Sequence, residues 1–197
     1  MSDAIGLGRV VVVDGGEGGR RVLRAIRELV RLGRAEAAVA VHGPLERHAA
    51  FLREADDAVE GHDRREALAA ARPGTVWIGR ASPSARAELA SWCAENGVRL
   101  VGPPADALRR ATTPAGLAAL AGELRVPLST AAQAPGARAI EVVVARDTEG
   151  RTRVIGLGDP ALRLGGAVVL SESSAAERWS EPERAAAALA VRACQAA

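Results

Sequence analysis

One stretch of the chain decides the fold: Arg9–Gly19, with the sequence RVVVVDGGEGG. Its first half, Arg9–Val13, is a nearly continuous apolar run, which is typical of a strand buried on both faces of a parallel sheet. The glycines that follow predict a turn. Residues 20–32 then predict a helix that ends at Gly33. Its apolar residues fall on a single helical stripe, formed by Val22, Leu23, Ile26, Leu29 and Val30.

The same alternation of strand and helix repeats along the first 125 residues. Strand patterns lie at 37–41, 57–59, 75–78 and 98–101, and helical patterns lie at 45–54, 64–71 and 83–96. Because parallel strands are joined by right-handed crossovers, this order predicts a doubly wound, Rossmann-like α/β sheet. Two helices, 105–111 and 114–124, are expected next, with Thr112 or Thr113 as the N-cap of the second.

The pattern changes after residue 125. Residues 126–137 are rich in Pro, Ala, Gly and Ser and predict a linker. Beyond them, 139–145 and 152–157 flank the turn Asp147–Gly150 and predict a β-hairpin. A third strand at 168–170 and a helix at about 181–196 complete the pattern. We therefore expect a Rossmann-like domain over 1–125, a linker over 126–137 and a small, mainly antiparallel α+β unit over 138–197.

The composition excludes several classes of function. All 26 basic residues are arginine, and the 197-residue sequence contains no lysine, which excludes Schiff-base and P-loop lysine chemistry. The formal charge of +2 and an aromatic content of 2% argue against nucleic-acid binding. The apolar runs are shorter than the roughly 18–20 residues of a membrane span, and the first residues do not resemble a signal peptide. We therefore expect a cytoplasmic protein that does not bind a membrane.

Two places along the chain carry residues suited to ligand binding. Gly16, Glu17, Gly18 and Gly19 follow the first strand and open a helix, where backbone amides bind phosphate in many α/β proteins. The alternative is a purely structural turn, since Asp14 and Glu17 bring negative charge to the phosphate position. His42 ends the second strand, at the edge where open α/β sheets place ligands.

The remaining candidates for chemistry are few. The three histidines lack the spacing of a zinc site, and Cys93 and Cys194 are expected to be buried hydrophobes rather than ligands. No serine, histidine and carboxylate can be grouped from their spacing. We therefore predict no catalytic residue, no metal site and no cofactor.

Several segments occur in an order that is found in a known family. Residues 11–29 are similar to the signature I-A-N-R-G-E-I-A-x-R-I-x-R-A-x-x-E-L, and further similar segments follow at 40–42, 55–59, 99–109, 126–127, 137–144 and 147–150. Together they resemble biotin carboxylases, the ATP-grasp subunits of acetyl-, propionyl- and pyruvate-carboxylases. The resemblance implies a pre-ATP-grasp domain over 1–125 and a truncated ATP-grasp-like subdomain over 138–197.

The departures from this family concern its catalytic motifs. Asp14 and Gly15 stand where the family has Asn and Arg, and Pro114 falls near its phosphate-binding lysine. Ten residues between Pro127 and Arg138 replace the lid, and the sequence stops before the metal-binding glutamates. Because phosphoryl transfer depends on positioning and charge neutralisation, the resemblance implies a pseudoenzyme without ATP-dependent carboxylation.

The resemblance also implies a partner surface. Arg24 and Glu28 match an arginine and a glutamate of the family's dimer helix, although an intrahelical pair is the alternative at this spacing. The expected function is a non-catalytic structural or regulatory subunit, as a homodimer or in a complex with biotin carboxylase or acyl-CoA carboxylase subunits. The alternatives are a small-molecule or nucleotide-binding module using Gly16–Gly19 and His42, or one part of a split biotin carboxylase.

Overall fold

Five parallel strands form the first sheet, and the Val-rich strand lies at its centre. The computed structural model describes residues 6–111, 113–126, 140–147, 149–164, 167–172 and 179–196, and only the backbone of 159–164, 167–172 and 196. The strand order is β3-β2-β1-β4-β5, and every pair is parallel. The predicted Rossmann-like fold is confirmed. The bounds are β1 Arg9–Val13, β2 Ala37–His42, β3 Asp57–Glu60, β4 Thr75–Ile78 and β5 Arg99–Val101.

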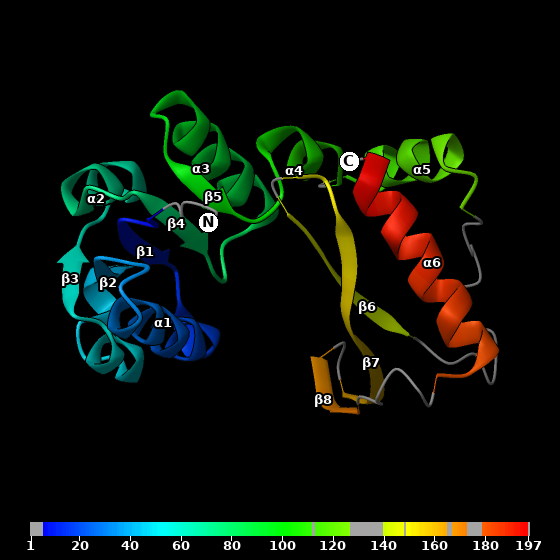
Figure 1. Ribbon diagram of the computed structural model, residues 1–197, viewed down its shortest axis with the longest axis horizontal. Coiled ribbons are helices and arrows are strands. Elements are labelled where there is room, and N and C mark those ends of the chain that lie inside the picture. Colours follow the sequence, from blue (N-terminus) through cyan, green and yellow to red (C-terminus); the bar gives the residue numbers. More distant parts are fainter. Residues whose placement is uncertain are drawn as a thin grey trace. The chain divides into compact units, whose positions relative to one another are not determined.

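Helices cover both faces of this sheet (Figure 1). Successive valines of β1 point to opposite faces, so Val10 and Val12 pack with Leu23 of α1 (Gly16–Arg31). On the other face, Val11 packs in one cluster with Leu68, which belongs to α2. The helices on that face are α2, Arg64–Ala71, and α3, Pro83–Glu95. Each fully buried aliphatic side chain contributes about 1.5–3 kcal/mol, so this two-sided burial explains the apolar run of β1.

The structure corrects two of the predicted helices. Residues 45–54 form two short 3-10 turns, η1 (Pro44–Glu46) and η2 (Ala50–Glu54), because the extended backbone of Ala49 interrupts the helical path. Helix α1 begins at Gly16 rather than at residue 20. The amide of Gly19 donates to the carbonyl of Gly15 over 2.6 Å, so the predicted glycine turn forms the first turn of the helix.

The described part of the second unit holds an antiparallel sheet and two helices. Backbone contacts divide the chain into residues 1–112, which include α4 (Ala105–Ala111), and residues 113–197. Strand β7 pairs with both neighbours, so it runs further than the predicted 152–157. The predicted linker, Val126 excepted, lies outside the described residues. The bounds are α5 Pro114–Glu123, β6 Glu141–Arg146, β7 Thr152–Leu164, β8 Ala167–Glu172 and α6 Glu181–Ala196.

Side-chain caps fix where three of the helices begin. Asp63 caps α2 by accepting hydrogen bonds from the amides of Arg65 and Glu66, and Ser82 caps α3. Thr113 caps α5 by accepting from the amide of Gly116 over 3.0 Å, so one of the two predicted caps is confirmed. Among the described residues, no helix is both long and apolar enough to cross a membrane.

Candidate functional site

A cavity of about 280 Å³ opens at the carboxyl ends of β1, β2 and β3. We call it the strand-edge cavity. Its polar groups come from the last residue of β2, from the loops that follow β1, β2 and β3, and from the first residue of α2. Parallel sheets place ligands at this edge because the loops that leave the strands meet there. The polar side chains that line it are Asp14, His42, Glu46, His62 and Arg64.

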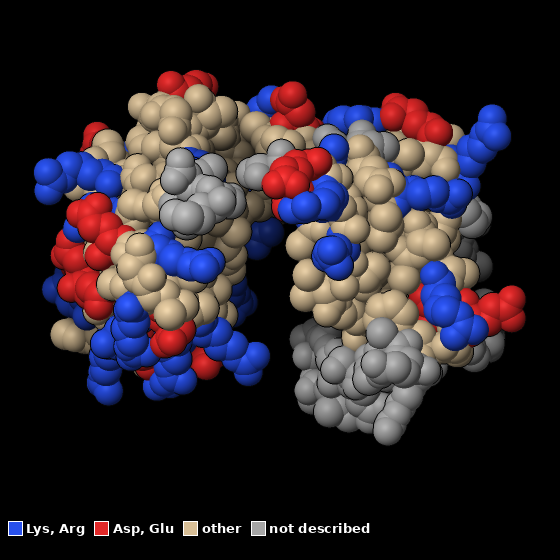
Figure 2. Space-filling view, in the orientation of Figure 1, with Lys and Arg blue, Asp and Glu red and all other residues tan. Residues whose placement is uncertain are grey.

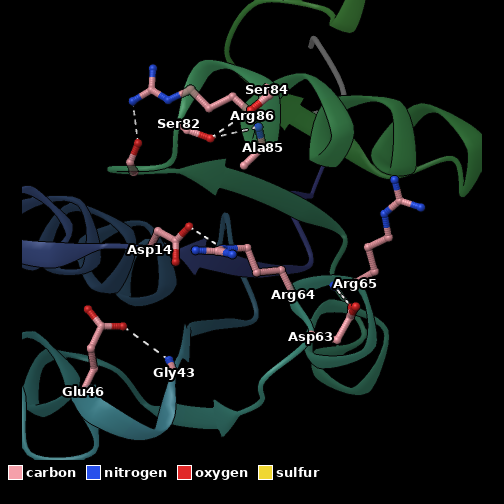
Figure 3. Close-up of polar contacts among 11 residues, drawn as sticks. Asp14, Gly43, Glu46, Asp63, Arg64, Arg65, Ser82, Ser84, Ala85 and Arg86 are labelled. Atoms are coloured by element: carbon pink, nitrogen blue, oxygen red, sulfur yellow. Dashed lines mark hydrogen bonds and ion pairs between the residues drawn. The ribbon is translucent and has the colours of Figure 1, made fainter.

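An ion pair between Asp14 and Arg64 forms one wall of the strand-edge cavity (Figure 3). Asp14 follows β1 with φ of +50°, a left-handed conformation that is uncommon outside glycine. Nε of Arg64 donates to Oδ2 of Asp14 over 2.7 Å. The Asp14 side chain is 18% exposed and that of Arg64 is 50% exposed. This hydrogen bond raises the pKa of the Arg64 guanidinium above its ordinary value, so Arg64 stays charged.

His42 is the buried histidine of the strand-edge cavity. It is 7% exposed, and its Nδ1 lies 2.9 Å from the carbonyl oxygen of Gly43. Because a carbonyl oxygen only accepts, Nδ1 must carry the proton and donate, which leaves Nε2 of the neutral ring as an acceptor. Glu46 lies in the same wall and accepts from the amide of Gly43 over 3.3 Å.

The predicted glycine residues do not share a cavity with His42. Gly16, Glu17, Gly18 and Gly19 form the first turn of α1 and are absent from the lining of the strand-edge cavity. Gly19 is buried against Val12. Of the predicted ligand-binding residues, His42 therefore lines this cavity and the glycine turn does not. Anion binding by the glycine turn stays a prediction.

The predicted interface residues, Arg24 and Glu28, take different partners. Arg24 donates to Oε1 of Glu54 over 2.6 Å, and Glu28 accepts from Arg31 over 2.6 Å. The same Oε1 of Glu54 accepts from Arg20 over 3.0 Å. The intrahelical pair considered as an alternative is therefore not formed. Hydrogen bonds from Arg24 and then Arg20 lower the pKa of Glu54 to about 2.

Glu54→Gln is expected to lower the melting temperature at pH 7, and this difference from the parent chain is expected to shrink as the pH falls below the ordinary glutamate pKa toward 2. The pKa of Glu54, about 2, lies below the ordinary glutamate value of about 4.3. Its ionised form therefore adds stability above that ordinary value, and this stability is lost as the pH falls through 2. Melting curves of the two proteins between pH 7 and pH 2 measure the effect. Glu36→Gln, at an exposed position, is the control. A difference in melting temperature between Glu54→Gln and the parent chain that does not change with pH would contradict the pairing.

The described residues form neither a metal-binding cluster nor a reactive thiol. Within them, no three His, Cys, Asp or Glu side chains are placed to hold a metal ion. Cys93 is 1% exposed, and burial raises the pKa of its thiol to about 11, so the thiol stays protonated and unreactive. Cys194 lies in α6 and is partly buried.

Sequence reasoning missed Arg64, Glu46 and His62 as members of the site. Arg64 follows the helix cap Asp63 in the sequence. Its side chain meets Asp14 at the end of β1 only in the folded sheet, where β1 lies next to β2. His42 was found because it directly ends a strand. A search of the few positions that follow each predicted strand would have found His62 as well, whereas Glu46 lay inside a predicted helix.

Comparisons with known proteins place these features in a family. The model of the family described as "Biotin carboxylase, N-terminal domain" matches residues 6–108. Among solved structures, a complete multifunctional pyruvate carboxylase from Rhizobium etli is similar, at 18% identity and a TM-score of 0.77, over 97% of this chain and 19% of that chain. A biotin carboxylase–βγ-ATP complex from Campylobacter jejuni is similar at 15% identity and a TM-score of 0.73, over 95% of this chain and 59% of that chain.

A third structure is similar at a higher identity. A single-chain, multi-domain long-chain acyl-CoA carboxylase matches at 25% identity and a TM-score of 0.73, over 94% of this chain and 20% of that chain. A search of curated proteins gave no match. The chain therefore spans about a fifth of the two large carboxylases and under two thirds of the Campylobacter jejuni biotin carboxylase.

Proposed function

Because the chain belongs to the biotin carboxylase N-terminal domain family, we propose that it is a structural or regulatory component of an acyl-CoA carboxylase-type assembly. In this role it does not carboxylate biotin itself. The family match covers the Rossmann-like unit, and the similar structures include a pyruvate carboxylase and a long-chain acyl-CoA carboxylase. In this role the chain has the fold of these carboxylases but does not catalyse the carboxylation of biotin.

The observation that carries the proposal is the Asp14–Arg64 ion pair at the end of β1. A carboxylate stands there, where the resembled signature has asparagine, and it accepts a hydrogen bond from the Arg64 guanidinium over 2.7 Å. Nucleotide phosphates need cations around them, because phosphoryl transfer depends on charge neutralisation. The 197 residues contain no lysine to supply such a charge. The strand edge is thus poorly suited to an ATP phosphate chain.

Helix α1 offers a surface for the partner. Glu17, Arg21, Arg24, Glu28 and Arg31 are all exposed, and they recur at intervals of three or four residues along one side of the helix. Arginine side chains gather over this part of the surface (Figure 2). If two such helices pack antiparallel about Arg24, Glu17 faces Arg31 of the second copy and Arg21 faces its Glu28, while the two Arg24 side chains face each other, each paired with Glu54 of its own chain. Four of the five positions of the stripe are therefore complementary to a second α1, from another copy or from a related biotin carboxylase subunit.

The proposal is tested by purifying the tagged chain from its native host and identifying what comes with it. We expect carboxylase subunits in the eluate, and we expect no bicarbonate-dependent release of ADP from the purified chain. A lone monomer with no carboxylase partner would remove the support for the assembly role. Turnover of ATP by the isolated chain would contradict the absence of catalysis.

Glu28→Arg is expected to reduce both partner recovery and self-association by about tenfold or more. The change makes the α1 stripe almost wholly basic, so two such stripes repel each other. Among the described residues Glu28 pairs with Arg31, at the surface of the same helix, so the fold should be kept. Glu88→Arg reverses the charge of an exposed residue of α3 and is the matched control. Equal recovery of both variants would show that the partner does not bind α1.

A second candidate function rests on the share of the similar structures that this chain matches. The chain spans 59% of the Campylobacter jejuni biotin carboxylase chain and 55% of the biotin carboxylase domain of a single-chain bacterial carboxylase. Another polypeptide that carries the remaining part would complete a split biotin carboxylase. The same purification distinguishes this case, because the recovered complex would then release ADP when given bicarbonate and biotin.

A further inference from the structure

The strand-edge cavity has the dimensions and the polar groups of a site for a small metabolite. Its volume of about 280 Å³ lies at the lower end of the range for small-molecule pockets, so a ligand of few atoms fits. It lies toward β2 and β3, and the glycine turn of α1 does not line it. A buried, partly unpaired histidine in its wall distinguishes it from an ordinary surface hollow.

Arg64 supplies the donors of the cavity. Only its Nε is committed, to Asp14, and the two terminal guanidinium nitrogens have no partner among the residues that the structure describes. The bond to Asp14 fixes the plane of the guanidinium. Two parallel N–H groups held in this way match the two oxygens of a carboxylate.

The acceptors of the cavity are His42 and Glu46. Nε2 of His42 is left as an acceptor because Nδ1 donates to the carbonyl oxygen of Gly43, and the residue is only 7% exposed. One oxygen of Glu46 accepts from the Gly43 amide, and Glu46 forms no ion pair with a described residue. These two groups call for a ligand group with several N–H donors and a positive charge.

The net charge of the cavity further restricts the class of ligand that it can bind. Asp14 and Glu46 outweigh Arg64 by one negative charge when the histidines are neutral. A phosphate or a nucleoside polyphosphate would meet two carboxylates and one guanidinium, which disfavours it. A zwitterion meets no such conflict, because its negative end faces Arg64 and its positive end faces Glu46.

We propose that the strand-edge cavity binds a free α-amino acid. Arg64 binds the carboxylate of the ligand, while Glu46 and Nε2 of His42 accept hydrogen bonds from its ammonium group. The Asp14–Arg64 ion pair holds the guanidinium in place and is not itself displaced. This binding site is separate from the α1 surface and needs no carboxylase partner.

Calorimetric titration of the intact chain with each of the twenty standard L-amino acids tests this proposal. At least one is expected to bind at millimolar concentration or below. Acetate and ethylamine, which carry only one of the two charged groups, are expected to bind about tenfold more weakly or less. No heat with any amino acid, or acetate binding as tightly as the best amino acid, would overturn the proposal.

Three variants test the assignment of the groups. Arg64→Gln and Glu46→Gln are each expected to weaken binding by about tenfold or more, because each removes a charged hydrogen bond. Arg65→Gln, at the next position of α2 and outside the cavity lining, is expected to bind like the parent chain. Far-UV circular dichroism checks folding, and Glu46→Gln decides the matter if Arg64→Gln is unfolded. Unchanged binding in Glu46→Gln would overturn the proposal.

Discussion

Replacing Gly79 by alanine is expected to lower the free energy of unfolding by about 3 kcal/mol or more. A Cβ atom at this position would lie 2.2 Å from the carbonyl oxygen of Asp14 and 2.9 Å from a ring carbon of Trp77. The first of these neighbours is backbone and cannot rotate away. The amide of Gly79 also donates to Val13 over 2.8 Å, so relieving the clash would pull apart the ends of β1 and β4. Urea unfolding of the parent and the variant measures the loss.

Gly18→Ala is the matched control, because it adds the same methyl group where there is room. No atom lies within 4 Å of the added Cβ, and Gly18 lies in the first turn of α1. Alanine loses less conformational entropy than glycine in a helix, so stability should rise by about 0.5–1 kcal/mol. Equal effects of the two substitutions would mean that β1 and the loop after β4 do not approach as closely as the structure has them.

The architecture of the first unit was predictable because its strongest signals are local. The valines of β1 admit little except a strand covered on both faces, and each following strand is bounded by a turn or a helix cap. The segment 45–54 was misjudged for the opposite reason. Its apolar spacing fits a helix, but the extended backbone at Ala49 divides it, and Phe51 is buried against α1 by tertiary packing.

The site was less predictable because its contacts join distant parts of the chain. Asp14 and Arg64 are 50 residues apart, and Arg24 and Glu54 are 30 apart. With 26 arginines and 24 carboxylates, the sequence alone does not determine which charges pair. Local spacing favoured Arg24 with Glu28, yet the side chain of Glu54 is 14% exposed and two arginines reach it. A partly buried carboxylate requires charged partners more strongly than a fully exposed one, so tertiary packing determines the pairing.

Leu68→Ala is expected to destabilise the first unit by about 2–5 kcal/mol. Leu68 is fully buried in α2 and packs with Val11 and Val39 of the sheet. The Asp14–Arg64 ion pair also fastens α2 to the sheet, but Arg64 is half exposed, so that pair contributes about 1 kcal/mol at most. Apolar burial must therefore hold α2, and with it Arg64, at the wall of the strand-edge cavity.

Thermal and urea unfolding of two further variants test whether apolar burial stabilises α2 more than the ion pair does. Leu45→Ala removes the same atoms from a fully exposed side chain, so its expected effect is within about 0.5 kcal/mol of zero. Arg64→Gln removes the ion pair but keeps Leu68 buried, so it should cost much less than Leu68→Ala. If Arg64→Gln were the more damaging of the two, the ion pair would be the main anchor of α2. The first turn of the helix would then depend on Asp14 for its position at the sheet.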